Sequence, residues 1–423
     1  MYQVENSGTL LGLRRRLTVG RSAELVSRNV VMLGLVSLFT DISSEMVSTI
    51  LPLYLVYTLG FTPLQYGALD GLYQGAGTLV RLGSGFLADR WRSHKQIAGI
   101  GYALSAVCKL AFPLVGSTYS ALGAVIVSDR VGKGVRTAPR DALISLSSRP
   151  ESLGLSFGVH RALDTAGAMI GPLVAFGFLA LQPDAFNSLF VVSFCVALVG
   201  LAILVLFVEN RPAPASPVEE AEPKRVSFRA AVGVLRATRF RVLAIAGVVL
   251  ALATVSDGFL YLVLQHELEF DIQYFPLLAV GTAFVYMTLA VPVGRLADRI
   301  GRVRVLLGGY VLMLGVYALL LGPNPSGLVV AAFLVLLGTY YAATDGVLAA
   351  IASEHLPAEL RGSGLAMVAT GTTLAGLVAS VAFGALWTAY GMRTAMVAFG
   401  IGMAASILVA TAAFARWGRT ARV

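Results

Sequence analysis

The sequence is poor in charged residues. Only 13% of its 423 residues are Asp, Glu, Lys or Arg, whereas 57% are hydrophobic. Soluble domains carry about 25% charged residues, so this scarcity excludes a soluble globular protein. No strand-like alternation dominates either, which argues against a membrane β-barrel.

The sequence also lacks the short motifs of common enzymes and metal sites. It has no phosphate-binding P-loop, so ATP is not indicated as an energy source, and it has neither an HExxH nor a CxxC pattern. The four histidines are scattered, and the two cysteines, Cys108 and Cys195, lie in apolar segments. We therefore expect a protein that is not an enzyme and has neither cofactor nor metal.

Long apolar runs recur along the whole chain. Most reach the roughly 18–20 residues that cross a bilayer as a helix. The expected fold class is an all-α membrane protein with about 12 transmembrane helices, arranged as two six-helix bundles related by pseudo-symmetry. The predicted spans are 29–57, 64–88, 97–116, 119–146, 153–180, 188–208, 242–265, 275–297, 304–321, 327–352, 363–388 and 392–415.

The basic residues predict an orientation. With a cytoplasmic N-terminus, most of the 32 Lys and Arg residues fall in segments on the cytoplasmic side. We expect a multi-pass protein of the inner or plasma membrane with both termini in the cytoplasm. The first 20 residues hold no apolar core of a signal peptide. Because the charges are spread over short loops, the net charge of +9 does not indicate nucleic-acid binding.

The composition changes at Glu209, where a stretch rich in Pro, Glu and Ala begins. A basic segment follows that could form an amphipathic helix attracted to anionic lipid. The predicted organisation is a cytoplasmic tail at 1–28, a six-helix bundle at 29–208, a cytoplasmic linker at 209–241, a second six-helix bundle at 242–415 and a tail at 416–423.

Two short patterns occur twice, at nearly the same separation. The residues GFLADR at 85–90 recur as GRLADR at 294–299, and VAFG at 174–177 recurs at 381–384. Two parallel halves joined by a linker suit a transporter in which one half rocks against the other.

The first of these patterns resembles the loop motif G-x-L-A-D-R-x-G-R of the major facilitator superfamily. The copy at 294–302 matches it fully, whereas the first copy has Arg92 and Ser93 where Gly-Arg is usual. The resemblance implies glycines that permit close packing and a charge latch that holds the inner gate shut in the outward-open state; the alternative is a plain solvated loop. The residues assigned to the gate are Gly85, Asp89, Arg90, Arg136, Arg140, Gly294, Asp298 and Arg299.

The fifth span carries Gly158, Gly167, Gly171 and Pro172. This spacing is similar to the antiporter motif of the same family, which is associated with export, although Ala175 and Phe176 replace its trailing glycines. The resemblance implies a drug:H⁺ antiporter. The small residues and the proline predict a kinked, closely packed helix at the interface of the halves; ordinary small-residue packing is the alternative.

Charged residues near the middle of several spans are expected to carry a proton. Arg130 belongs to an R-x-x-x-G element that resembles the one placed in proton coupling in this family, and a charge at that depth costs at least a few kcal/mol unless it is paired. Two acids in a low-dielectric cavity cannot both ionise cheaply. A static buried salt bridge is the alternative. The proton-coupling candidates are Asp41, ranked first, with Glu45, Arg130, Arg161 and Asp164.

The resemblance also implies that the first, fourth, seventh and tenth spans line a central cavity. The substrate-binding candidates are Asp257, Asp345, Tyr340, Tyr341 and His160, the last with packing as its alternative.

The predicted function is a proton-coupled secondary active transporter that works by alternating access and exports a small organic or amphipathic compound. Two alternatives stay open: an H⁺ symporter that imports a small organic anion, which four arginines support, and a lipid or glycolipid flippase. The expected partners are the substrate, protons and the lipid bilayer, with no nucleic acid, and the expected state is a monomer. The arginines that support an anion are Arg130, Arg136, Arg140 and Arg161.

Overall fold

The computed structural model describes residues 26–91, 93–149, 152–210, 237–322, 327–354, 356 and 361–419. In the first half, a π-helical turn, η2 (Tyr54–Thr58), continues the first helix directly. The helices of this half are α1 (Arg28–Leu53), α2 (Pro63–Trp91), α3 (His94–Val115), α4 (Tyr119–Leu146), α5 (Leu153–Leu181) and α6 (Phe186–Phe207).

The second half begins with a helix that is interrupted, and a short 3₁₀ turn, η5 (Ile272–Tyr274), precedes its next long helix. Its helices are α8 (Thr238–Leu252), α9 (Asp257–Leu268), α10 (Phe275–Ile300), α11 (Arg302–Leu320), α12 (Gly327–Glu354), α13 (Arg361–Tyr390) and α14 (Met392–Arg419).

These helices agree with the predicted spans to within a few residues, if α1 is counted with η2 and α8 with α9. Ten spans in the described part of the chain are long and apolar enough to cross a membrane by length and composition. The other two, α2 and α4, carry more charge along their length. The predicted all-helical fold of two six-helix bundles is therefore confirmed, whereas residues 211–236 of the predicted linker lie outside the described residues.

The span predicted at 242–265 is present but interrupted, because residues 253–256 leave the helix between α8 and α9. Tyr317 of α11 stabilises this break. Its hydroxyl accepts a hydrogen bond from the Val255 N–H at 2.8 Å and donates one to the Ala253 carbonyl at 2.9 Å. Backbone groups that the helix no longer pairs therefore gain a partner in the apolar interior.

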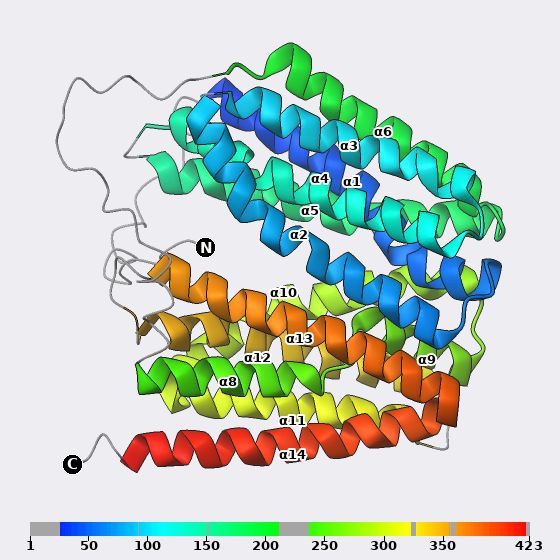
Figure 1. The fold of residues 1–423 in the computed structure, drawn as a ribbon, viewed down its shortest axis with the longest axis vertical. Coiled ribbons are helices and arrows are strands. Elements are labelled where there is room, and N and C mark those ends of the chain that lie inside the picture. The colour runs from blue at the N-terminus through cyan, green and yellow to red at the C-terminus, as the bar shows by residue number, and fades with distance from the viewer. Residues whose placement is uncertain are drawn as a thin grey trace.

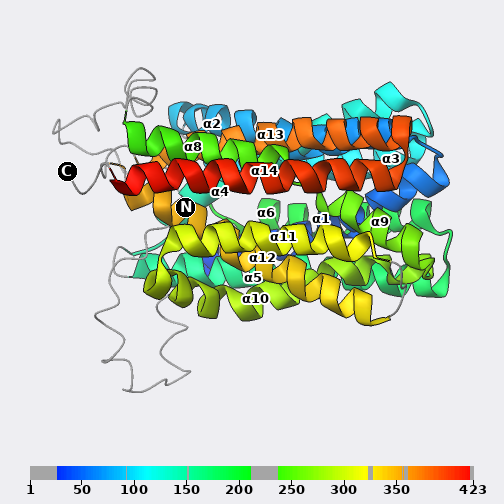
Figure 2. The same ribbon diagram turned by 90° about the horizontal axis from the view of Figure 1, so that it is seen from below.

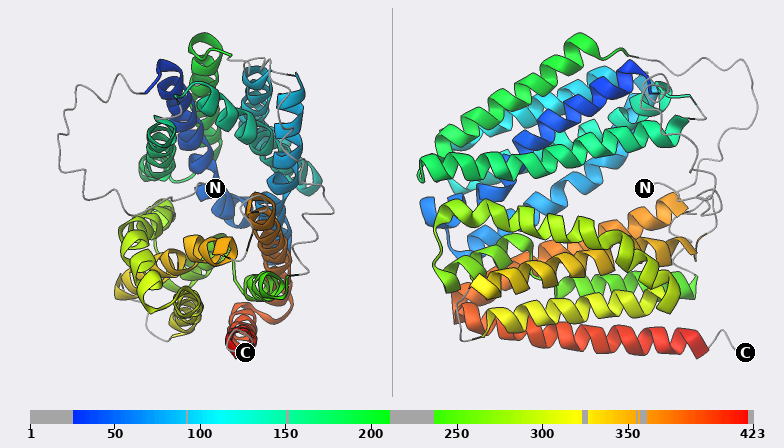
Figure 3. Two further views of the ribbon diagram at one scale, coloured as in Figure 1. Left: turned by 90° about the vertical axis from the view of Figure 1, so that its left-hand side faces the viewer. Right: turned by 180° about the vertical axis from the view of Figure 1, so that it is seen from behind.

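The two halves form separate groups of helices when viewed along the helix axes (Figure 3, left). We call the end where α1 begins and α14 ends the linker end, and the opposite end the far end. The halves meet at the far end and diverge toward the linker end (Figure 1). Within the second half, α10, α11, α12 and α14 run side by side along the molecule (Figure 2).

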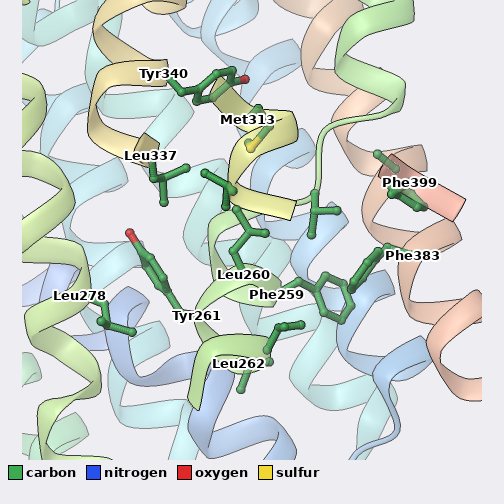
Figure 4. Close-up of a cluster of buried hydrophobic side chains, with 14 of the residues drawn as sticks. Phe259, Leu260, Tyr261, Leu262, Leu278, Met313, Leu337, Tyr340, Phe383 and Phe399 are labelled. Carbon is green, nitrogen blue, oxygen red and sulfur yellow. The ribbon is translucent and has the colours of Figure 1, made fainter. Parts of the chain in front are cut away.

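The short helix α9 lies at the far end and packs against the first half as well as the second (Figure 1). Its residues from Phe259 to Leu264 are all buried, because neighbouring helices surround it on every side. The Phe259 ring packs edge-on against the Phe383 ring of α13, with centroids 4.8 Å apart. Figure 4 shows Tyr261 on the other side of α9, directed toward α12. This packing fixes the position of the break before α9.

Gly167 and Gly171 of α5 pack closely against α1 within the same half. A Cβ added at Gly171 would lie 2.6 Å from the Ile42 carbonyl oxygen, and Gly167 lies equally close to the Leu38 backbone. A different part of α5 meets the other half, where Phe176 stacks on Tyr274 with centroids 6.0 Å apart. Close approach of α1 and α5 is thus the structural role of this motif.

Gly171→Ala should lower the stability of the protein, because the added methyl group would force α1 and α5 apart. Overpacking of this kind costs about 1–3 kcal/mol. The midpoint of thermal unfolding in detergent measures the effect. Gly177→Ala is the matched control on the same helix, since nothing lies within 4 Å of its added Cβ. Equal midpoints for the two variants would contradict the close packing of α1 and α5.

Candidate substrate cavity and buried charge clusters

A cavity of about 660 Å³ lies between the two halves. Residues of α1 and α2 form its wall on one side, and residues of α8 to α13 form the other. Glu45 of α1 and Asp70 of α2 contribute carboxyl groups from the first half. Asp257, the first residue of α9, and Asp345 of α12 contribute two more from the second half. Within the described part of the chain, Lys, Arg and His are absent from this wall.

Tyrosine is the other prominent residue of the wall. The Tyr341 hydroxyl donates a 2.6 Å hydrogen bond to Asp257 Oδ1. The Tyr340 and Tyr341 rings are 5.1 Å apart, and Tyr286 packs edge-on against Tyr341 and contacts Asp345. The structure therefore brings four predicted substrate-binding residues into one wall. The tyrosines that line the cavity are Tyr66, Tyr73, Tyr261, Tyr286, Tyr310, Tyr340 and Tyr341.

A seam between α2 and α13 closes the cavity toward the far end. The Ser380 hydroxyl of α13 donates a 2.8 Å hydrogen bond to Asp70 Oδ2. Nearer the far end, the Leu64 N–H donates to the Thr388 hydroxyl at 2.9 Å. Gly71 of α2 lies directly against Leu377 of α13, so the two backbones can approach closely. We call these contacts the far-end seam.

Asp41 and Asp164 meet in the first half, as the sequence predicted from their depth. Their side chains contact each other across α1 and α5. Arg136 of α4 approaches Asp41, with Nη2 and Oδ1 3.8 Å apart. Arg140 approaches Asp164 at 3.7 Å and also binds Asp141 at 2.9 Å. Two of the arginines assigned to the gate therefore lie against two of the proton-coupling candidates.

His160 belongs to this same cluster and does not line the cavity. Its Nε2 lies 2.8 Å from the Ser37 hydroxyl of α1, and Arg140 Nη1 donates to that hydroxyl at 3.3 Å. Arg161 is different, because its side chain is 78% exposed while it pairs with Asp164 at 3.1 Å. His160 is therefore buried beside the acid pair, whereas Arg161 contacts Asp164 from the exposed side.

Arg130 belongs to a second buried cluster, separate from Asp41. Its guanidinium binds the neighbouring Asp129 carboxylate and lies over the Tyr73 ring, 3.8 Å from the centroid. Lys109 of α3, only 2% exposed, reaches the same carboxylate at 3.4 Å. Glu45 lies within electrostatic reach of Arg130, although its carboxylate accepts a 2.7 Å hydrogen bond from Ser48.

The second copy of the loop motif makes its contacts inside its own half. Asp298 pairs with Arg302 at 2.8 Å, and Arg302 reaches Glu354 of α12 at 2.5 Å. Gly294 has open space around it, and Arg299 is exposed. The side chains of the first copy, with Gly85, Asp89 and Arg90, lie outside the described residues. The charge latch at the gate stays a prediction. Gly158, which was assigned to the helix-packing motif, also faces open space.

Sequence reasoning missed three charged residues that the structure places at important positions. Asp70 joins the cavity to the far-end seam, and Lys109 and Asp129 complete the cluster of Arg130. Each is a charge inside an apolar span, which was the signal available for finding it. Among the described residues, no group of three or more His, Cys, Asp or Glu is placed to hold a metal ion.

Two helical bundles around a central cavity, closed at one end, define a polytopic transporter fold, and the comparisons agree. The model of the Major Facilitator Superfamily matches residues 33–278 and 254–421. An uncharacterized MFS-type transporter of Methanocaldococcus jannaschii is 31% identical over 372 residues, covering 86% of this chain and 89% of the relative. This chain belongs to the major facilitator superfamily.

Other similarities concern part of the chain or the fold alone. An uncharacterized protein of Mycobacterium tuberculosis is 34% identical over 201 residues, or 48% of this chain and 49% of that protein. The solved nucleoside transporter NupG has a TM-score of 0.77 at 15% identity, covering 92% of this chain and 99% of NupG. A POT family transporter, solved with a thioalcohol-conjugated peptide, has a TM-score of 0.74 at 12% identity, covering 93% of this chain and 96% of its own.

Proposed function

We propose that this chain is a proton-coupled secondary active transporter that works by alternating access and exports a small organic or amphipathic compound. The observation that supports it most is a cavity shared by both halves and closed by the far-end seam, together with a half-buried pair of acids in the first half. Rocking the halves about the cavity would break that seam and expose the cavity on the other side. The loop charges support a cytoplasmic linker end.

The Asp41–Asp164 pair is the proposed proton site. Two carboxylates in contact repel each other, so the pair holds one proton more readily than a lone acid does. Arg136 and Arg140 flank the pair and favour its remaining negative charge. Because α1, α4 and α5 carry these groups, a movement of the first half changes the access of water to the pair. Proton release and uptake on opposite sides would then drive transport.

The direction of transport rests on the glycine and proline pattern of α5. The same helix carries Asp164 and packs on α1 through Gly167 and Gly171, next to Asp41. The motif therefore holds the two acids of the proton site together, which is a physical reason for its association with proton-driven export. A proton gradient that is higher outside then favours outward movement of the substrate.

Asp41→Asn should abolish substrate-evoked proton movement. The experiment uses proteoliposomes with an internal pH dye and a panel of candidate substrates, because the amide cannot release a proton. Asp184→Asn is the control, since Asp184 lies exposed in the loop between α5 and α6. Proton flux that survives in Asp41→Asn but is lost in Asp164→Asn or Glu45→Gln moves the coupling site. Substrate movement without any proton flux in the wild type would overturn proton coupling.

A further inference from the structure

We propose that the substrate is an organic cation whose charged group lies between Asp70 and Asp257 and whose apolar body packs on the tyrosines of the cavity. The inference rests on the proposed transport function, to which it adds a substrate class. It also decides between the cationic and anionic substrates that the sequence left open.

The charge of the cavity wall has one sign. Glu45, Asp70, Asp257 and Asp345 line it, and the described wall includes no basic side chain to balance them. In a space screened from bulk water, such a wall attracts cations and repels anions. A carboxylate-bearing substrate would lose its hydration and gain no counter-charge, which makes its binding unfavourable.

The four arginines that favoured an anion are engaged elsewhere. Arg136 and Arg140 pair with Asp41 and Asp164, outside the cavity wall. Arg130 is held by Asp129, and the Tyr73 ring covers it. None of these three lines the cavity. Arg161 is exposed and acts electrostatically on Asp345, and Arg130 acts on Glu45, so the charges of these two acids of the wall are already partly balanced.

Asp70 and Asp257 face each other from opposite halves and influence each other electrostatically. Their hydrogen bonds come from neutral groups. Ser380 and Gln74 donate to Asp70 at 2.8 and 3.2 Å, and Tyr341 donates to Asp257 at 2.6 Å. Neither acid forms an ion pair within the described part of the chain. A positive charge between them would relieve their repulsion, and it would contact both halves at once.

The tyrosine rings fit the rest of such a ligand. Aromatic faces bind cations, with greater strength where water is excluded. The wall shows this preference in its own structure, because Tyr73 lies beneath the guanidinium of Arg130 at 3.8 Å. Tyr66 and Tyr261 flank the two acids from α2 and α9 and supply apolar surface beside the charge. An amphipathic amine or a quaternary cation combines both features.

The test compares two ions of nearly equal size and shape and opposite charge, tetraphenylphosphonium and tetraphenylborate. Their binding to the purified wild-type protein is measured by equilibrium dialysis, with protein-free micelles as the blank for each ion. We expect saturable binding of the phosphonium and none of the borate. Tighter binding of the borate, or no saturable binding of the phosphonium, would overturn the proposal.

Variants locate the charged group. Asp257→Asn should weaken phosphonium binding by about 30-fold, as expected for one partner of a buried charged contact. Asp257→Glu should retain most of the affinity, and Asp184→Asn, in the exposed loop between α5 and α6, should leave it unchanged. Unchanged affinity in folded Asp70→Asn and Asp257→Asn would overturn the assigned position.

The binding test and the transport test can fail independently. Phosphonium binding without proton flux in proteoliposomes would keep the substrate class and reject proton coupling. Proton flux evoked by anions alone would keep the proposed function and reject an organic cation.

Discussion

Asp129→Asn should leave little folded protein, which is the largest stability effect that we expect. The carboxylate of Asp129 is the shared partner of Lys109 and Arg130, and all three side chains are at most about one-tenth exposed. Removing one partner of a buried ion pair costs about 3–5 kcal/mol. That is a large part of the 5–15 kcal/mol that stabilises a typical protein. The yield of monodisperse protein after detergent extraction, and its thermal midpoint, measure the loss.

A second substitution tests whether the unbalanced positive charge causes the loss of folded protein. Lys109→Met combined with Asp129→Asn removes one of the two unbalanced cations, so it should recover part of the yield. The matched control is Asp298→Asn, because its pair with Arg302 is solvent-exposed and such pairs contribute about 0–1 kcal/mol. A yield and midpoint of Asp129→Asn equal to those of Asp298→Asn would contradict the role of Asp129.

The charged residues of the first half show how well the depth of a residue along its helix predicts its neighbours. The sequence correctly placed Asp41 and Asp164 together, because both lie about the same number of turns into spans that begin on the same side. It could not tell which face of α4 meets α1. As a result, Arg136 contacts Asp41, while Arg130 turns to Asp129 and Tyr73. Helix rotation depends on side-chain packing, which hydropathy does not record.

The break before α9 has a similar explanation. Hydropathy predicts a span correctly because a bilayer requires an apolar length, and residues 242–265 satisfy that requirement. The break depends on a hydroxyl that arrives from α11, namely that of Tyr317. The sequence predicted Asp257 as a substrate-binding residue. Asp257 is the first residue of α9 because the helix breaks just before it.

The two halves contribute different chemistry to the proposed mechanism. The first half contains the ion pairs of Asp41, Asp129 and Asp164, none of which is part of the cavity wall. The second half contributes most of the tyrosines of the wall. Asp70 is the residue that connects these roles, because it lines the cavity and accepts a hydrogen bond across the far-end seam. A cation bound at Asp70 would compete with Ser380 for the same carboxylate and loosen the seam.

A covalent link across that seam should stop transport completely. Leu64→Cys with Thr388→Cys places two thiols where the backbone of α2 meets a side chain of α13. A short bifunctional thiol reagent would then hold the halves together at the far end, and alternating access requires them to part there. The native Cys108 and Cys195 are replaced first, since Cys195 is exposed. Uptake of a labelled substrate into proteoliposomes, before and after the reagent, measures the effect.

The control links two positions at the same end within one half. Tyr119 of α4 donates a hydrogen bond to the Gln65 carbonyl of α2 at 3.4 Å, so Gln65→Cys with Tyr119→Cys accepts the same reagent. This link joins helices that move together as one bundle, and transport should continue. Full transport by the linked Leu64–Thr388 pair would mean that the far-end seam never opens, and alternating access about this cavity would be wrong. Loss of transport in that pair alone identifies the seam as a gate, because only there does the link join the two halves.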